Sequence, residues 1–317
     1  DLLGTSRQLG APTWFLTLSA DVRHWPEVLR PCYERSYPGK TISDEEIQKL
    51  SSIARNNLLR AHPAVAAIHF KKRVQVLFRH LKKTNFLGKI SDFYYRFEWQ
   101  ARGSPHAHCL IWCSDAPTVG QASNEEVAKY IDKFISGRMP NEQEHKELRD
   151  LVAKLQVHGH REKCQTRKVK ISKQDQETLT DEEKKKKIQD GKCRYGFPKP
   201  VEEKTRLMIP EMVQKTIQEM EEAHDKEIKE LRAKMEKEGR SGGEVEAAVK
   251  KKKDEMEVGK KDLLQASSVE VRLERGPEDC YVNNYNPSIL LAWKANMDLQ
   301  FVSNAYAAIM YITGQFL

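Results

Sequence analysis

Two histidines separated by a single residue open an apolar stretch, and they constrain the fold of this chain more than any other feature. They are His106 and His108, and the stretch after them runs to Cys113 as Cys-Leu-Ile-Trp-Cys. Successive side chains of a β-strand point to opposite faces, so a strand here directs both imidazoles to one face and Ala107 to the other. Side-by-side imidazoles suit a divalent metal. We therefore predict a strand that carries two candidate metal ligands.

A second strand before the histidines offers further ligands. Residues 94–100 alternate in polarity and Arg102–Pro105 reads as a turn, which together predict a hairpin. Glu98 and Gln100 share one face of the first strand. Gln100 is our first choice for a third ligand, because its place just before the turn lies closer to the histidines, and Glu98 is the second. Two histidines in one strand also occur without any ligand role, and the residues alone leave that alternative open.

Periodicity and capping signals predict the other elements. Two capping boxes, each a serine followed three residues later by a glutamate, predict helices that begin after Ser43 and Ser123. Apolar stripes predict helices over 64–83 and roughly 141–157. Further strands are predicted over 13–19, 269–273 and 298–302, and a last helix near 303.

Residues 158–200 are basic, poor in large apolar residues, and carry four candidate zinc ligands. Four nitrogen and sulfur ligands drawn from two separated clusters are the usual tetrahedral arrangement of a structural zinc. The spacing matches no standard pattern, so a surface loop with incidental His and Cys is the alternative. The candidates are His158, His160, Cys164 and Cys193.

Two long charged helices are predicted over 210–238 and about 244–264, with a break at 239–243. Apolar residues of the first helix recur at spacings of three and four, and Glu and Lys occupy its other faces. An antiparallel helical hairpin fits this pattern. It is interpreted as a packing device or a partner surface without chemistry of its own, with His224 in its seam.

Charge and cysteine content narrow the class of protein. The net charge is +8 and the isoelectric point about 9.0, which suits a polyanionic partner without proving one. Six cysteines in a chain of 317 residues favour metal ligands or free thiols over a disulfide framework. No apolar run approaches the length of a membrane span.

Five segments, in order along the chain, resemble Helitron rolling-circle transposases and the Helitron-like amino-terminal domain of helicases related to them, members of the HUH endonuclease superfamily. The string EWQARGSPHAHCLIW is similar to the family signature EFQxRGxPHxHxLLW. The segment CRYGFPKP resembles the family's CRFxFPRP. The other matching segments are QLGAPTWFLTLS, YVNNYNPSILLAWKANMDLQFV and AYAAIMYIT.

The resemblance implies a metal-dependent endonuclease and strand transferase that acts on single-stranded DNA, a DNA hairpin or a junction. His106 and His108 would be ligands of Mg²⁺ or Mn²⁺, with Gln100 or Glu98, and a tyrosine would form a 5′-phosphotyrosine link. Tyr311 is the candidate nucleophile. The resemblance also implies a nuclear location.

The tyrosine motif departs from the family pattern. Helitron-type proteins usually carry a second tyrosine one helical turn after the first, and this chain has Gln315 there. The chain begins at Asp1 and stops at Leu317 inside a predicted helix, so we expect it to be a fragment with a helicase domain carboxyl-terminal to it.

The expected fold is α+β, with a central antiparallel sheet of about five strands, flanking helices, and the two-histidine hairpin in its middle. A Cys/His knuckle and a helical hairpin would be insertions. The expected division is a nuclease core over 1–157, the knuckle over 158–200, the charged helical insertion over 201–265, and a return to the core, with the truncated tyrosine helix, over 266–317.

Two alternatives remain open. The first is a decayed or domesticated copy that binds single-stranded or junction DNA without cutting it, which the glutamine at 315 favours. The second is an interaction module built on the 210–264 helices. For DNA binding, Arg96 and Arg102 are candidate phosphate contacts and Trp99 a candidate for stacking on an unpaired base.

Overall fold

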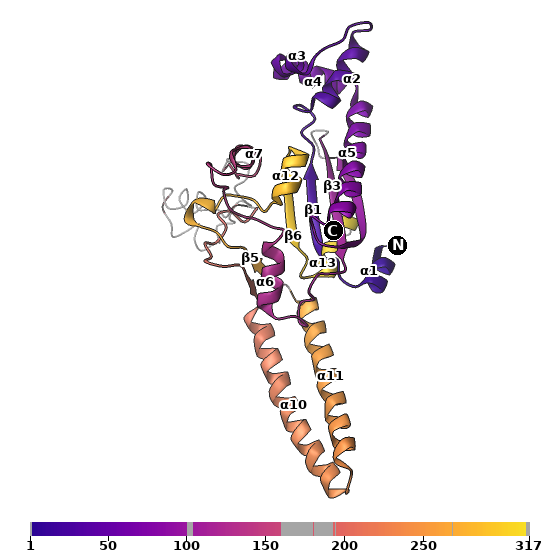
Figure 1. The fold of residues 1–317 in the computed structure, drawn as a ribbon, viewed down its shortest axis with the longest axis vertical. Helices are drawn as coiled ribbons and strands as arrows, with labels where there is room; N and C mark the ends of the chain where they lie inside the picture. Colours follow the sequence, from indigo (N-terminus) through magenta and orange to yellow (C-terminus); the bar gives the residue numbers. More distant parts are fainter. Residues whose placement is uncertain are drawn as a thin grey trace.

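A central antiparallel sheet organises the molecule in the computed structural model, which describes residues 2–99, 104–159, 180, 193, 195–267 and 269–314. Within these residues the central sheet has four strands in the order β2-β3-β1-β6. Their bounds are Trp14–Ser19 (β1), Ile90–Trp99 (β2), Pro105–Cys113 (β3) and Met297–Phe301 (β6). The two-histidine strand β3 is an inner strand, but its hairpin partner β2 is an edge strand, so the hairpin lies at one side of the sheet and not in its middle as predicted (Figure 1).

The helices surround this sheet and extend beyond both of its ends (Figure 1). Their bounds are Leu2–Leu9 (α1), Pro26–Ser36 (α2), Asp44–Lys49 (α3), Ser52–Ala61 (α4), Pro63–Thr84 (α5), Asn124–Asp132 (α6), Lys146–Leu155 (α7), Glu211–Lys237 (α10), Gly242–Ala266 (α11), Pro287–Trp293 (α12) and Ala305–Thr313 (α13). The capping boxes predicted at Ser43 and Ser123 are both present, and a helix begins after each.

One face of the sheet is apolar and buried under α5, α6 and α12. Trp14 and Leu16 of β1 are fully buried there, and Trp14 stacks on Tyr130 of α6 with ring centroids 5.7 Å apart. Phe78 of α5 stacks on Phe93 of β2 at 4.5 Å. The apolar stripe of α5 predicted from the sequence is therefore the side that covers this face.

The opposite face of the sheet is apolar at one end of the strands and polar at the other. At one end Leu110 and Trp112 of β3 are buried against Ile309 and Ile312 of α13. At the other end the same face carries the two histidines, because the alternation of side chains continues along β3. The α13 helix thus lies beside the histidines.

The strand predicted over 269–273 forms, but it does not join the central sheet. It is β5 (Glu270–Arg272), and it pairs with β4 (Arg206–Met208) in a separate two-stranded sheet. The expectation of about five central strands is therefore wrong for the described residues, which contribute four. The cause is topological. Strand β4 directly precedes α10 and β5 directly follows α11, so the two strands that flank this pair of helices pair with each other.

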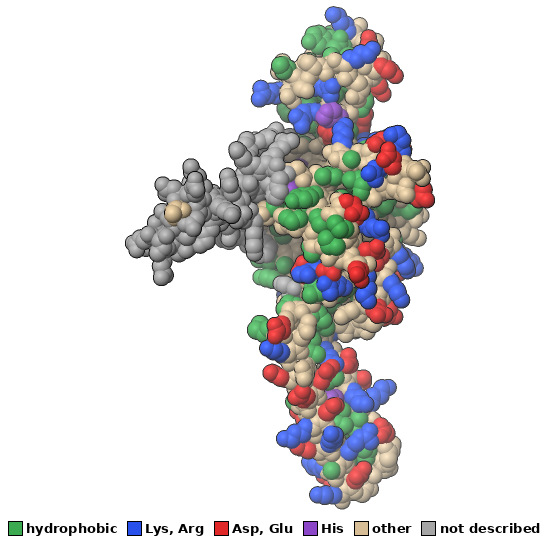
Figure 2. Space-filling view, turned by 90° about the vertical axis from the view of Figure 1, so that its left-hand side faces the viewer, with side chains coloured by type: hydrophobic (Ala, Val, Ile, Leu, Met, Phe, Trp, Pro, Cys, Tyr) green, Lys and Arg blue, Asp and Glu red, His purple; other side chains and the backbone are tan. Residues whose placement is uncertain are grey.

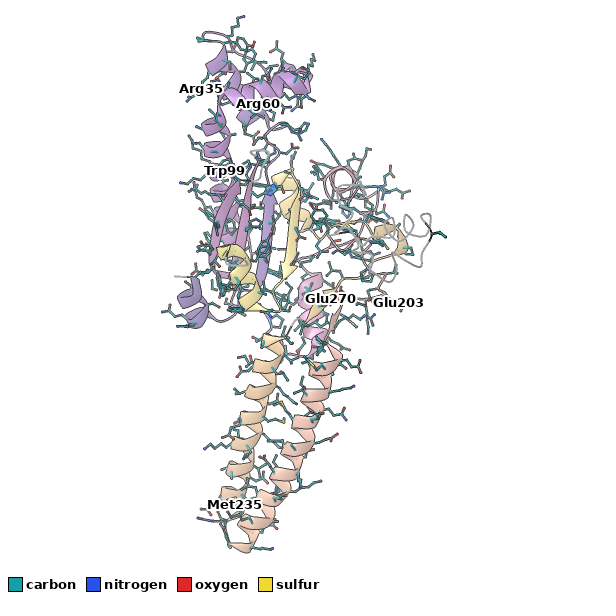
Figure 3. All side chains as sticks on the ribbon, turned by 180° about the vertical axis from the view of Figure 1, so that it is seen from behind. Arg35, Arg60, Trp99, Glu203, Met235 and Glu270 are labelled. Carbon is teal, nitrogen blue, oxygen red and sulfur yellow. The ribbon has the colours of Figure 1, made fainter. Side chains whose placement is uncertain are left out.

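Between β4 and β5, helices α10 and α11 form an antiparallel hairpin that projects from the sheet, which we call the arm (Figure 1). Its seam includes His224, as predicted, whose Nε2 lies 3.0 Å from the carbonyl oxygen of Lys252. Ion pairs such as Arg232–Glu246 cross between the helices. Charges of both signs are mixed over its surface (Figure 2), and Met235 lies near its tip (Figure 3).

No helix in the described parts of the chain has the length and apolar character needed to cross a membrane.

Candidate active site

The register of the sheet places a row of polar side chains around the two histidines. His108 pairs with Thr17 of β1 and with Arg96 of β2, and Thr17 pairs in turn with Asp298 of β6. His106 pairs with Ser19 and with Glu98. Residues paired across an antiparallel sheet share a face. Four strands therefore bring these groups to one face.

Two side chains fix the ring of His108, which is only 7% exposed. Its Nδ1 lies 3.2 Å from the hydroxyl of Thr17, and its Nε2 lies 2.9 Å from Oε2 of Glu98. The hydroxyl can donate to Nδ1 or accept from it, so the contact orients the ring in either tautomer. An imidazole held in this way by a second side chain is typical of a metal ligand.

His106 is half-buried on the same face of β3. Burial, more than the nearby His108, lowers the pKa of its imidazole, while the negative charge of Glu98 acts in the opposite direction. A lowered pKa favours the neutral ring, which is the form that binds metals. Gln100, the other candidate for the third ligand, lies outside the described residues.

The described residues contain no group of three or more His, Cys, Asp and Glu side chains that could hold a metal ion. What they contain is the Glu98–His108 pair, with His106 beside it in the sheet register. Two ligands of one cation, each at about 2.1 Å and at right angles, lie about 3 Å apart. The 2.9 Å between Oε2 of Glu98 and Nε2 of His108 is close to that separation. This pair therefore fits two positions around a divalent cation.

Tyr311 of α13 lies against His108 of this pair. Its ring meets the ring of His108 edge-on with centroids 5.5 Å apart, and it meets Phe15 in the same way at 5.5 Å. The residue is 55% exposed, so a large substrate can reach it. Burial first, and then the negative charges of Glu98 and Asp298, raise the pKa of its phenol. The phenol is therefore protonated at neutral pH, because even its ordinary pKa is about 10.

Local interactions at both ends of α13 set the position of Tyr311. The helix begins at a cap in which the side chain of Asn304 accepts from the backbone N–H of Ala307. It ends at Gly314, whose φ of +71° suits glycine. Arg96, a candidate phosphate contact, is exposed and donates from Nη1 to the carbonyl of Ile312 at 3.0 Å. A cation at the carboxyl end of a helix stabilises it, so Arg96 holds α13 onto β2.

Burial of two isoleucines adds to this attachment. Ile309 and Ile312 are each 2% exposed, and they pack on Leu110 and Trp112. Fully burying such a side chain contributes roughly 1.5–3 kcal/mol. Both isoleucines lie within two residues of Tyr311, so packing and the Arg96 contact act on the same turn.

Thr17 and Asp298 are members of the site that the sequence did not single out. Burial raises the pKa of the Asp298 carboxyl, and its contact with Gln300 acts in the opposite direction. The available signal was the alternation in β1, where Thr17 and Ser19 lie on the face opposite to the buried Trp14, Leu16 and Leu18. Which partner strands these residues would meet was not readable from the sequence.

The remaining DNA-binding candidates fall at the end of β2. Trp99 is 53% exposed and lies at the end of the sheet nearer α2 and α4, which carry Arg35 and Arg60 (Figure 3). Its indole is therefore accessible for stacking. Arg102 lies outside the described residues.

Two of the four candidate zinc ligands are described, and they lie together. Nε2 of His158 is 3.4 Å from Sγ of Cys193, and the ring of His158 stacks on Phe197 at 4.5 Å. The other two candidates, His160 and Cys164, lie outside the described residues.

Comparison with known proteins finds a family to which the first part of the chain is similar. No curated protein matches the chain. The family model described as the Helitron helicase-like domain at the N-terminus matches residues 1–111. This span includes Glu98, His106 and His108, whereas Asp298 and Tyr311 lie beyond it. The resemblance predicted from the motifs is thus confirmed over residues 1–111, which are similar to this Helitron-like N-terminal domain.

Proposed function

We propose that this chain is a metal-dependent endonuclease and strand transferase that acts on single-stranded DNA and forms a 5′-phosphotyrosine intermediate. The match over residues 1–111 indicates a role related to Helitron transposition. The observation that carries the catalytic proposal is the contact of Tyr311 with His108, which itself contacts Glu98. A nucleophile candidate from the last described helix and a ligand pair from the β2–β3 hairpin converge on one face of the sheet.

Glu98 and His108 are the residues proposed to hold Mg²⁺ or Mn²⁺, with a third ligand from His106 or Gln100. A divalent cation bound there would supply positive charge that polarises the phosphodiester and lowers the pKa of a neighbouring phenol. The raised pKa of Tyr311 supports the need for such a charge, because the protein surroundings alone disfavour the phenolate. Thr17 would keep the ring of His108 in a ligating orientation.

In the proposed reaction, the phenolic oxygen of Tyr311 attacks the phosphorus of a single-stranded phosphodiester. The bond from that oxygen to phosphorus forms as the bond from phosphorus to the 3′-oxygen breaks. The phenolic proton leaves to solvent, to which Tyr311 is half exposed, and the departing 3′-oxygen gains a proton. The phosphotyrosine link conserves the energy of the broken ester, so a second hydroxyl can reverse the step and join strands.

The test is covalent capture of DNA by the whole chain. A single-stranded oligonucleotide labelled at its 3′ end is incubated with the protein and Mn²⁺ or Mg²⁺, and the products are separated on a denaturing gel. We expect a protein–DNA adduct with either metal and none with EDTA. Binding of the oligonucleotide without any adduct, in either metal, would favour the alternative of a DNA-binding module that has lost its chemistry.

We also propose a structural zinc ion held by His158, His160, Cys164 and Cys193. A nitrogen ligand at about 2.0 Å and a sulfur ligand at about 2.3 Å lie roughly 3.5 Å apart on tetrahedral zinc. The separation of 3.4 Å between His158 and Cys193 supports this arrangement. We expect the purified chain to retain about one zinc ion after dialysis and Cys193→Ala to lose it, as measured by elemental analysis. The control is Cys113→Ala, on β3; equal zinc content in both variants would contradict the proposal.

A further inference from the structure

A cavity of about 470 Å³ opens beside Tyr311, between the sheet and the start of α13. This volume falls within the range of about 300–1,000 Å³ that is typical of small-molecule sites. Phe15 and Tyr311 supply aromatic walls, and Thr17, Asp298 and Gln300 supply polar groups. An aromatic cavity with a few polar groups is suited to a planar, polar-edged ligand such as a nucleobase.

The polar part of this cavity consists mainly of Asp298 and Gln300. Nε2 of Gln300 donates to Oδ2 of Asp298 at 2.5 Å. The amide oxygen of Gln300 accepts no hydrogen bond among the described residues. The pair therefore presents acceptors, together with an amide donor, on one side of the cavity. Carboxylate and amide groups of this kind pair with the amino and ring nitrogen groups of bases.

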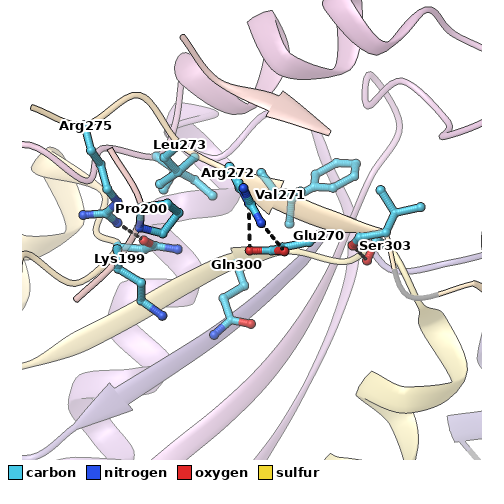
Figure 4. Close-up of a pocket in the computed structure, with 13 residues that line it drawn as sticks. Lys199, Pro200, Glu270, Val271, Arg272, Leu273, Arg275, Gln300 and Ser303 are labelled. Carbon is cyan, nitrogen blue, oxygen red and sulfur yellow. Dashed lines mark hydrogen bonds and ion pairs between the residues drawn. The ribbon is translucent and has the colours of Figure 1, made fainter. Parts of the chain in front are cut away.

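A second cavity, of about 290 Å³, continues from the first one and contains a lysine (Figure 4). The two share Val269, Gln300, Phe301 and Ser303, so they are contiguous along the edge strand β6. Figure 4 shows Lys199 and Gln300 extending in the same direction from this lining.

Lys199 is the cation of the second cavity that is available to an anion. Its Nζ donates to the carbonyl of Tyr195 at 3.3 Å, lies 4.9 Å from the centroid of the Phe197 ring, and forms no ion pair with a carboxylate among the described residues. Arg272 is paired with Glu270, as the dashed lines in Figure 4 indicate. Arg275 is buried and donates to backbone carbonyls, including those of Gly137 and Val282. An ammonium beside a base-sized cavity is the arrangement that one nucleotide requires.

We propose that the two cavities bind one nucleotide of the unpaired strand, adjacent to the phosphate that faces Tyr311. Its base occupies the larger cavity against Phe15, with Asp298 and Gln300 along its polar edge, and its phosphate lies at Lys199. The identity of the ligand as part of a DNA strand rests on the proposed function. The direction of that strand is then set: it runs from Tyr311 along β6 toward Lys199.

Binding of single-stranded oligonucleotides tests this independently of cleavage. The whole chain carrying Tyr311→Phe, which retains the aromatic wall, is titrated in EDTA with fluorescent oligonucleotides that carry an abasic site at each position in turn. We expect one position at which base removal weakens binding roughly tenfold, because stacking of one base contributes about that much. Ala308 of α13 also lines the larger cavity. Ala308→Phe, which fills this cavity, should remove the difference between abasic and intact strands at this position. Should Ala308→Phe fail to fold, Gln300→Ala provides the same comparison, with a partial reduction expected.

The proposed contact between Lys199 and the phosphate is tested separately, by the salt dependence of the affinity. Lys199→Gln should reduce the slope of log affinity against log salt by about 1, whereas Lys204→Gln, at an exposed position, should leave it unchanged. An abasic series with no special position, or a salt slope unaltered by Lys199→Gln, overturns the proposal even if the adduct forms. A special position without any adduct would support this site and count against the endonuclease instead. If a free nucleoside monophosphate competes as well as the oligonucleotide, the site is one for mononucleotides and the strand assignment is wrong.

Discussion

Tyr311→Phe is expected to abolish the covalent protein–DNA adduct while leaving DNA binding intact. The substitution removes only the phenolic oxygen and keeps the ring that packs against Phe15 and His108. Loss of a nucleophile lowers the rate by more than about three orders of magnitude, so no adduct should be detectable. The denaturing-gel assay measures the adduct, and fluorescence anisotropy in EDTA measures binding.

The same helix provides a matched control. Tyr306 is 65% exposed on α13, and Tyr306→Phe makes the identical chemical change away from His108. It should form the adduct at the rate of the unaltered chain. If Tyr306→Phe lost the adduct and Tyr311→Phe retained it, the nucleophile would have been assigned to the wrong residue.

His108→Ala is expected to lower adduct formation by about a hundredfold to a thousandfold, since a group that stabilises transition-state charge contributes about that much. The variant removes the ring that lies between Thr17 and Glu98 and leaves the carboxylate without its partner. Initial rates of adduct formation over a range of Mn²⁺ concentrations measure the effect. The required Mn²⁺ concentration should rise together with the loss of rate.

Two further variants serve as controls for the expected effect of His108→Ala. His80→Ala changes an exposed histidine on α5, away from the polar face, and should have no effect. Thr17→Val keeps the shape but removes the hydroxyl at Nδ1 of His108, and a loss of roughly tenfold to a hundredfold is expected for such a supporting contact. A Thr17→Val variant as inactive as His108→Ala would contradict this supporting role, because the hydroxyl would then matter as much as the imidazole itself.

Local patterns in the sequence predicted the elements whose formation depends on nearby residues. The capping boxes at Ser43 and Ser123, the stripe of α5 and the alternation in β3 all depend on residues within a few positions of each other. The place of β5 was not predictable in this way. A three-residue strand such as Glu270–Arg272 has no periodicity that selects a partner, and its pairing with β4 results from the arm that joins them.

The candidate site shows the same division. His106 and His108, and Glu98 as the second choice after Gln100, were predicted because they belong to one hairpin. Their meeting with Thr17, Asp298 and Tyr311 depends on pairings between distant parts of the chain, which one sequence does not specify. Arg96 illustrates the difference: its charge predicts a phosphate contact, whereas its hydrogen bond to the end of α13, more than 200 residues away in the sequence, was not predictable.

The way in which the arm is attached has a consequence for how this molecule tolerates change. The chain leaves at Arg206–Met208 and returns at Glu270–Arg272, two segments hydrogen-bonded to each other. Whole turns can therefore be added to or removed from both helices together without altering the spacing of any strand in the central sheet. Growth and loss of sequence at the tip of the arm are therefore expected to leave the remainder unchanged, whereas its base packs on the core through Val213 and Leu264.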